Sequence, residues 1–235
     1  MMARTLAEVA PEVEPLLERV EPPVDPTPVR LMDAAERLIA EQGVDRTSLR
    51  AINAAAGSNV AAAHYHFGSK EGLVSAVLLR RMDEVSRERR ALMAPLERED
   101  RPPIRSVIGA LVEPFARRAL ADGDTYVRFL GAIYRAGDPW WNLASEAFAP
   151  QYRQFIPLLE RSLPRLPQPV RSFRLRAAAT TLFAVLAAPE HYWSPPLPAA
   201  GEFVEDIIDL FQSMVAGPAC SHDPEEVKMP RGRPG

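Results

Sequence analysis

TSLRAINAAAGSNVAAAHYHFGSKEGL, residues 47–73, is the stretch of this sequence that decides its fold. The hydroxyl of Thr47 is suited to cap a helix, because it can accept a hydrogen bond from the free N–H groups of the first turn. Leu49 and Ile52 then fall on one helical face. Gly57 is suited to stop this helix. We therefore expect a short amphipathic helix at the start of the stretch.

A second short helix follows almost at once. Either Ser58 or Asn59 can cap it, so the chain reverses direction through a turn of about three residues, the spacing of a helix-turn-helix. We expect the second helix over residues 59–66, and Ser69 then caps the start of another helix. The pattern indicates a DNA-reading unit whose recognition helix is this second helix.

An earlier helix supports this pair. Residues 28–42 carry an apolar stripe opposite a charged face, and Gly43 closes the pattern. The resulting three-helix unit is expected to enclose a small core made by Leu31, Ala35, Leu38, Ile39, Val44, Leu49, Ile52, Tyr65 and Phe67.

These residues resemble the DNA-binding domain of the TetR family of bacterial transcriptional regulators. The resemblance covers residues 29–77, and its most specific part is YHF at 65–67 followed by SKE at 69–71. Family members that are similar over AAAHYHFGSKEGL include regulators of lipid metabolism. The resemblance thus implies a DNA-binding regulator and leaves its effector open.

The same resemblance implies an all-α fold. An N-terminal three-helix helix-turn-helix DNA-binding domain is expected over residues 28–75, and a helical ligand-binding and dimerisation domain over 76–216. The arm 1–27 is expected to be partly disordered with some helix, and 217–235 to be a disordered basic tail.

Few side chains of the expected recognition helix are suited to read bases. Residues 59–66 contain no Arg, Lys or Gln, so Asn59 is their one candidate for bidentate readout. Ala62 stands where the family pattern has threonine, which puts a hydroxyl contact to phosphate in doubt and leaves a small contact to thymine methyl groups. The DNA-binding residues that we expect are Thr47, Arg50, Asn59, Ala62, His64, Tyr65 and Lys70.

Helical periodicity continues beyond the helix that opens at Ser69. Further helices are expected over residues 104–121, 124–136, 139–162, 170–188 and 201–215. The third of these is rich in aromatic residues and contains Pro150 and Pro157, where a bend or break is expected. Aromatic side chains here either line an effector cavity or pack in the core. The candidate ligand-pocket residues are Phe129, Tyr134, Trp141, Phe148, Tyr152 and Phe155.

The last two expected helices are suited to dimerisation. The helix over 170–188 is apolar around much of its circumference, so it must be covered. The resemblance implies that this pair of helices and its copy form a four-helix bundle in a homodimer. The expected dimer-interface residues are Phe173, Leu182, Val204, Ile208 and Phe211.

Charge and cysteine content limit the partners. The formal net charge of −3 argues against coating of nucleic acid, and residues 29–90 hold ten Lys and Arg against eight Asp and Glu. Tight operator binding therefore needs two copies. The single Cys220, the lack of an apolar leader and the lack of an apolar run of about 20 residues predict a cytoplasmic protein without a membrane partner.

No motif indicates catalysis. The sequence has no Gly-flanked nucleophilic serine and no Gly-rich phosphate loop, so we expect no enzyme and no cofactor. His64 and His66 are two residues apart on a helix and point in different directions, so no metal site is expected.

Two hypotheses follow. The first is a repressor that leaves a near-palindromic operator, its double-stranded DNA partner, when a small and hydrophobic effector binds. The alternative is a small-molecule binding or scaffolding protein of the same fold whose operator binding is weak or lost. The tail residues 231–233, Arg-Gly-Arg, either lie in an A·T-rich minor groove or form a disordered basic end.

Overall fold

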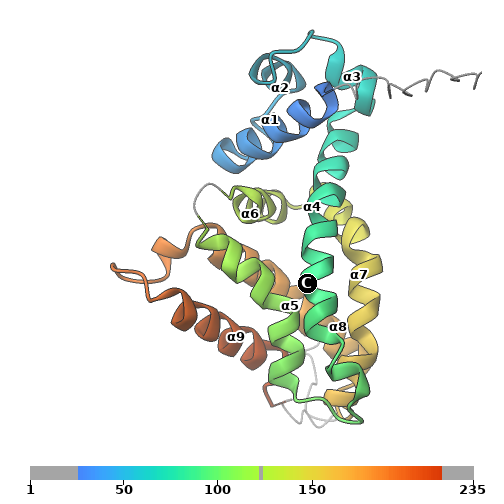
Figure 1. Ribbon diagram of the computed structural model, residues 1–235, viewed down its shortest axis with the longest axis vertical. Coiled ribbons are helices and arrows are strands. Elements are labelled where there is room, and N and C mark those ends of the chain that lie inside the picture. The colour runs from blue at the N-terminus through green and yellow to red at the C-terminus, as the bar shows by residue number, and fades with distance from the viewer. Residues whose placement is uncertain (1–25, 122–123, 219–235) are drawn as a thin grey trace, which may run out of the picture.

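The computed structural model describes residues 26–121 and 124–218, and every regular element in those two ranges is a helix (Figure 1). This confirms the expected all-α fold. The helices are α1 (Thr27–Gln42), α2 (Leu49–Ala55), α3 (Ala62–Phe67), α4 (Lys70–Met93), α5 (Ile104–Ala119), α6 (Tyr126–Ala136), α7 (Trp140–Ser162), α8 (Gln168–Ala187) and α9 (Ala200–Ala216), with short 3-10 turns at Leu96–Arg98 and Pro189–His191. Cys220, the Arg-Gly-Arg tail and most of the N-terminal arm lie outside the described residues.

The helices α1, α2 and α3 form a small unit at one end of the long helix α4 (Figure 1). Its core is closed by Leu31, Ile39 and Ile52, none of which is exposed. The prediction that Tyr65 belongs to this core is wrong, because its side chain is 83 % exposed. Ala63, fully buried, takes the inward position on α3, and a residue two places along a helix points elsewhere.

The helix α4 runs from this unit into the second half of the molecule (Figure 1). Its first turns bury Leu73 and Val77 against α1 and α3, and its later turns bury Met82, Val85 and Met93 against α5 and α7. One continuous helix therefore touches both parts of the fold.

The other helices pack tightly around the second half of α4. The helix α6 crosses α8 at Gly131, where an added Cβ would lie 2.4 Å from the Cβ of Ala187. Only a glycine permits this approach. The helix α7 is unbroken at Pro150 and Pro157, so the break considered from the sequence does not occur.

The helix α9 packs against α5 of its own chain. Leu182, Val204, Ile208 and Phe211 are only 6 %, 8 %, 5 % and 3 % exposed in this single chain. The core of their own subunit already covers these four side chains, so they have little surface left to bury against a second subunit. Of the five expected interface residues, Phe173 alone is exposed, at 67 %.

No helix in the described ranges is long and apolar enough to cross a membrane.

Candidate functional site

The helix α2 begins one residue later than expected. The Oγ of Ser48 accepts a hydrogen bond from the backbone N–H of Ala51 at 3.1 Å, so Ser48 is the cap. The neighbouring Thr47 is 1 % exposed, and its hydroxyl donates to the carbonyl of Gly43 at 2.8 Å. Thr47 therefore holds the turn after α1, which contradicts both its expected capping role and its expected phosphate contact.

The turn between α2 and α3 is organised by Asn53, which is 2 % exposed. Its Nδ2 donates to the carbonyls of Leu49 and Val60, each at 2.9 Å, and its Oδ1 accepts from the backbone N–H of Ala63 at 2.9 Å. One buried amide thus fixes the angle between the two helices. The role of Asn53 was not predicted, although a polar residue next to Ile52 on the inner face of α2 was a usable signal.

The recognition helix is shorter than expected and begins at Ala62. The side chain of Asn59 accepts a hydrogen bond from the N–H of Ala61 at 3.1 Å, and this Asx turn keeps residues 59–61 outside the helix. Tyr65, 83 % exposed, and Val60, 73 % exposed, both project from this part of the chain. Large exposed side chains on a rigid short helix are suited to contact a partner surface.

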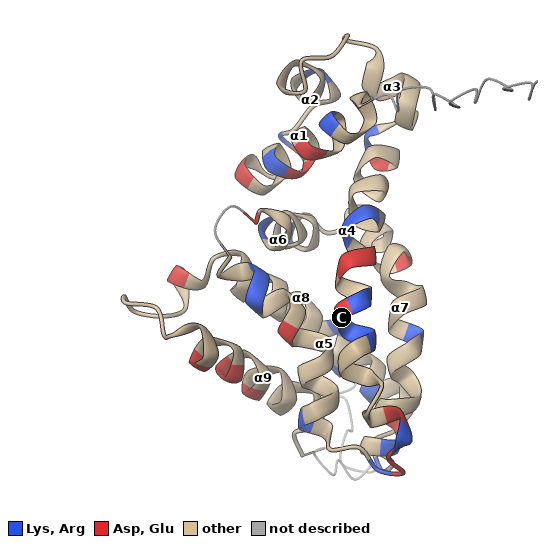
Figure 2. Cartoon of the chain, viewed as in Figure 1, with Lys and Arg blue, Asp and Glu red and all other residues tan. Residues whose placement is uncertain are grey.

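Four of the seven expected DNA-binding residues present exposed side chains: Arg50, Asn59, His64 and Tyr65. Ala62 is half-buried and Thr47 is buried. The surface of α2 and α3 carries little charge in Figure 2, and Arg50 is its single Lys or Arg within these two helices. Phosphate contacts from this surface must therefore rest on few cations and on backbone N–H groups.

The ammonium of Lys70 is turned towards the protein. Its Nζ donates to the carbonyl of Val44 and lies 5.2 Å from the centroid of the Trp140 ring. Burial lowers the pKa of Lys70, and the charges of Asp45 and Glu71 oppose that shift. The ammonium is already engaged in this geometry, so it must leave the carbonyl of Val44 before it can make the expected phosphate contact.

The start of α7 lies against the DNA-binding unit. The indole N–H of Trp140, a side chain 6 % exposed, donates to Oδ1 of Asp45 at 3.0 Å. Asp45 follows α1, and Lys70 opens α4, so one indole ring joins three segments. This contact was missed from the sequence because Asp45 and Trp140 are far apart in the chain.

A second junction is polar. Glu36 of α1, 6 % exposed, accepts a hydrogen bond from the hydroxyl of Thr125 at 2.8 Å. Arg81 of α4 pairs with Asp124 at 2.9 Å and lies 3.7 Å from Glu36. Burial by itself would lower the pKa of Arg81. The negative charges of Glu36 and Asp124 outweigh this effect and raise the pKa above the usual range. The segment that leads into α6 is thus tied to both α1 and α4.

The six expected ligand-pocket residues, which we call the aromatic cluster, lie on α6 and α7. Phe129 and Phe155 are fully buried, whereas Tyr134, Trp141, Phe148 and Tyr152 are half-buried. The ring of Tyr134 stacks on Phe183 at 4.9 Å and meets Trp141 edge-on at 6.5 Å. Two of the six side chains are therefore closed off from solvent, and four keep some exposure.

Arg89 of α4 lies beside this cluster and is 9 % exposed. Its guanidinium carbon is 4.7 Å from the ring centroid of Phe115 and 5.5 Å from that of Phe155. Burial lowers the pKa of Arg89 to about 10, so the group remains a cation at neutral pH. A cation at this position was not foreseen, because Arg89 sits in the charged run RERR, which indicates a solvated face.

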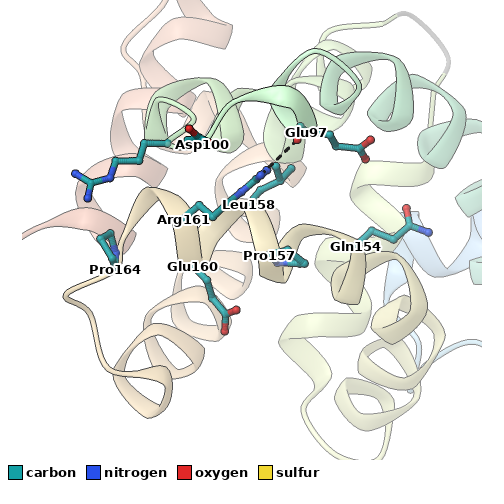
Figure 3. A pocket seen from close by; sticks show the side chains of 9 residues that line it. Glu97, Asp100, Gln154, Pro157, Leu158, Glu160, Arg161 and Pro164 are labelled. Carbon is teal, nitrogen blue, oxygen red and sulfur yellow. Dashed lines mark hydrogen bonds between the residues drawn. The ribbon is translucent and has the colours of Figure 1, made fainter.

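An open hollow of about 710 Å³ lies at the far end of α7, beside the turn after α4 (Figure 3). Leu158 and Pro157 line it together with charged side chains such as Glu160 and Asp100. Arg161 crosses its wall and donates to the carbonyl of Glu97 at 3.3 Å. A smaller hollow of about 290 Å³ lies between α5, α6 and α8. The six expected pocket residues line neither hollow, and the charged, open walls of the larger one suit an apolar effector poorly.

Within residues 26–121 and 124–218, no group of three or more His, Cys, Asp or Glu side chains is placed to hold a metal ion.

Comparisons with known proteins agree on one family. The model of bacterial regulatory proteins of the tetR family matches residues 31–77, and that of the tetracyclin repressor-like C-terminal domain matches residues 109–217. No protein with a curated description matches the chain.

Solved structures share the fold. NalD, the secondary repressor of the MexAB-OprM multidrug efflux pump in Pseudomonas aeruginosa, is 25 % identical with a TM-score of 0.52, over 78 % of this chain and 95 % of its own. The SmeT–triclosan complex, a repressor from Stenotrophomonas maltophilia, is 19 % identical with a TM-score of 0.53, over 80 % and 90 %. FadR from Bacillus subtilis in complex with stearoyl-CoA is 12 % identical with a TM-score of 0.59, over 81 % and 99 %.

Proposed function

The chain belongs to the TetR family of bacterial transcriptional regulators, and from this premise we propose that it is a homodimeric repressor released from its operator by a small apolar effector. The observation that carries the proposal is that the recognition helix α3 is exposed, while α6 and α7 both contact the DNA-binding unit of α1, α2 and α3. A DNA-reading surface and an effector domain are thus in direct mechanical contact.

The DNA-binding side of the proposal rests on α2 and α3. Asn53 fixes the two helices relative to one another, and Tyr65, His64 and Asn59 project from the fixed frame. Rigid placement of base-contacting groups is what sequence readout requires. With few cations on this surface, a single copy would bind weakly, so two copies on a near-palindromic site are proposed.

The effector side rests on the aromatic cluster. An apolar ligand that packs on the half-buried aromatic rings removes apolar surface from water. This stabilises the complex by about 25 cal/mol for each Å² of apolar surface buried. Triclosan and stearoyl-CoA, found in the complexes of SmeT and FadR, both carry large apolar groups. An apolar effector seated between α4 and α7 is consistent with both observations.

The route between the two sites runs through α4, α6 and α7. An effector that separates α7 from α4 also moves Trp140, whose indole holds Asp45. A shift of α6 acts on α1 through Thr125 and Glu36. Both movements would change the spacing of the recognition helices, which must lie about 34 to 36 Å apart to enter successive major grooves.

The dimer surface is proposed to be the outer side of α8 and α9. Phe173 is 67 % exposed and Leu210 is 41 % exposed, and no segment of the described chain covers them. Exposed large apolar side chains on adjacent helices are typical of an interface between subunits.

The test is selection of DNA duplexes from a random library by the full-length protein, followed by fluorescence anisotropy. We expect inverted half-sites whose centres are about 10 bp, or a multiple of it, apart. Tyr65→Ala should weaken binding to the selected site by about 1 to 3 kcal/mol. The exposed Tyr192, remote from α3, supplies the matched control Tyr192→Ala, which should bind normally. If no sequence is enriched, the alternative of a small-molecule binding or scaffolding protein replaces this proposal.

A further inference from the structure

Among the described residues, no carboxylate pairs with Arg89, unlike the buried Arg171 and the half-buried Arg81. Arg171, 7 % exposed, pairs with Glu160 at 2.6 Å. Arg81 pairs with Asp124 and lies near Glu36. Arg89 makes one hydrogen bond within the described chain, to the backbone carbonyl of Leu111 at 2.6 Å, and its Nε is buried without a partner.

The neighbours of Arg89 give its charge little compensation. The rings of Phe115 and Phe155 flank the guanidinium. Their cation–π contacts make up for only part of the hydration energy that the guanidinium loses on burial. A buried charge normally needs both a counter-charge and further hydrogen bonds. The site therefore holds one positive charge and spare hydrogen-bonding capacity.

Two phenol groups add to that capacity. Tyr134 and Tyr152 lie close enough to Arg89 to influence its pKa, and neither hydroxyl has a hydrogen-bond partner among residues 26–121 and 124–218. Burial raises the pKa of both phenols, so they stay protonated and able to donate. The guanidinium, held between the rings of Phe115 and Phe155, thus has two further O–H donors in its vicinity.

We propose that Arg89, Tyr134 and Tyr152 form the polar end of the effector site and bind the carboxylate of a monoanionic organic acid whose apolar or aromatic body lies among the rings of α7. This rests on the proposed function and names the chemical class of its effector. One buried cation balances one negative charge, which favours a carboxylate over a doubly charged phosphate.

The half-buried rings of Trp141 and Phe148 mark the approach to this site. Both lie on α7 and keep some exposure to solvent, whereas Phe155 of the same helix is buried. An acid that enters along this face would place its body against α7 and its carboxylate at α4. It would thus contact α4 and α7, two of the helices that touch the DNA-binding unit.

The test is calorimetry on the full-length protein with two acids and their neutral analogues: decanoate against decanol, and 2-naphthoate against 2-naphthalenemethanol. The unmodified protein should bind at least one acid about tenfold or more tightly than its alcohol, as expected for a charge-assisted hydrogen bond in a buried site. Equal or weaker binding of both acids would overturn the proposal.

Variants separate anchoring from packing. Arg89→Met should remove the preference for the acid and leave affinity for the alcohol, while Arg89→Lys should keep part of the preference. The matched control is Arg90→Met, because Arg90 is the next residue of α4 and is exposed. A normal acid preference in Arg89→Met, or equal losses for acid and alcohol, would show that Arg89 only packs.

A second variant tests the donors without touching the arginine. Tyr134→Phe combined with Tyr152→Phe removes two hydroxyls that hold no hydrogen bond to any described residue, so the fold should survive even if Arg89→Met does not. The preference for the acid should fall severalfold, and an unchanged preference would contradict the assigned donors. Operator binding without any acid is measured in parallel, so that failure of this site and failure of DNA binding are told apart.

Discussion

The indole nitrogen of Trp140 donates a hydrogen bond to the carboxylate of Asp45 at 3.0 Å, and this bond joins the first residue of α7 to the turn after α1. The same indole ring lies over the ammonium of Lys70. The C-terminal domain is therefore held to the DNA-binding unit by a contact that does not pass through the backbone of α4. A domain held at two separate places cannot move as a simple extension of one helix.

The first prediction concerns this contact. Trp140→Phe, Asp45→Ala and the double variant should give a coupling energy of about 1 kcal/mol in a double-mutant cycle, because each single change removes the same hydrogen bond. Urea unfolding followed by circular dichroism supplies the four free energies. Additive effects of the two single changes would mean that the bond contributes nothing to stability.

The second prediction concerns Asn53. Asn53→Ala leaves the carbonyl of Val60 and the N–H of Ala63 without their partner, at a cost of about 1 to 3 kcal/mol for each group that stays buried. Both thermal stability and operator affinity should fall. Asn59→Ala is the matched control: its side chain is exposed, so operator affinity should fall while thermal stability stays within about 0.5 kcal/mol of the unmodified protein. A stable Asn53→Ala protein would refute the role given to this amide.

The third prediction separates two basic residues. Arg50 is exposed on α2 without an ion pair among the described residues, so Arg50→Gln should weaken binding to every duplex and lower the salt slope by about 0.9. Lys70→Met should leave the slope nearly unchanged, because its ammonium is held by the carbonyl of Val44. Anisotropy titrations at several salt concentrations measure both slopes. A larger change for Lys70→Met would show that its ammonium turns outward to reach phosphate.

The fourth prediction concerns the dimer. Phe173→Glu should give a folded monomer, since the side chain is exposed in the single chain and a charge would block its burial between subunits. Ile208→Ala should instead destabilise the chain itself by about 2 to 4 kcal/mol, because its side chain fills space against α5. Sedimentation and thermal unfolding distinguish the two effects. A fully dimeric Phe173→Glu protein would exclude this part of α8 from the interface.

The sequence predicted the helices well, because burial of one face imposes a period that survives in the order of residues. It predicted caps less well. Thr47 and Ser48 both carry hydroxyls, and the carbonyl of Gly43, which engages Thr47, is visible only in three dimensions. It also showed that Ile208 and Phe211 are buried, but the identity of their cover, α5 or a second subunit, depends on tertiary packing.

Contacts between distant residues lay beyond the sequence. Nothing near Asp45 marks it as the partner of Trp140, and the run RERR conceals that Arg89 points inward while its neighbours point to solvent. Periodicity assigns a residue to a face of a helix. A charged residue on the buried face looks like an exception to the pattern, and only its three-dimensional neighbours show why it is buried.

Effector binding and operator binding are expected to weaken one another through the helices that join the two sites. The most direct measurement is the affinity of the unmodified protein for its selected operator, by fluorescence anisotropy, with and without decanoate at a concentration that calorimetry shows to be saturating. A coupling of about 1 to 3 kcal/mol predicts a loss of operator affinity of roughly 5- to 150-fold, no loss with decanol at the same concentration, and no response in Arg89→Met. An operator affinity that is the same with and without bound decanoate would contradict the account.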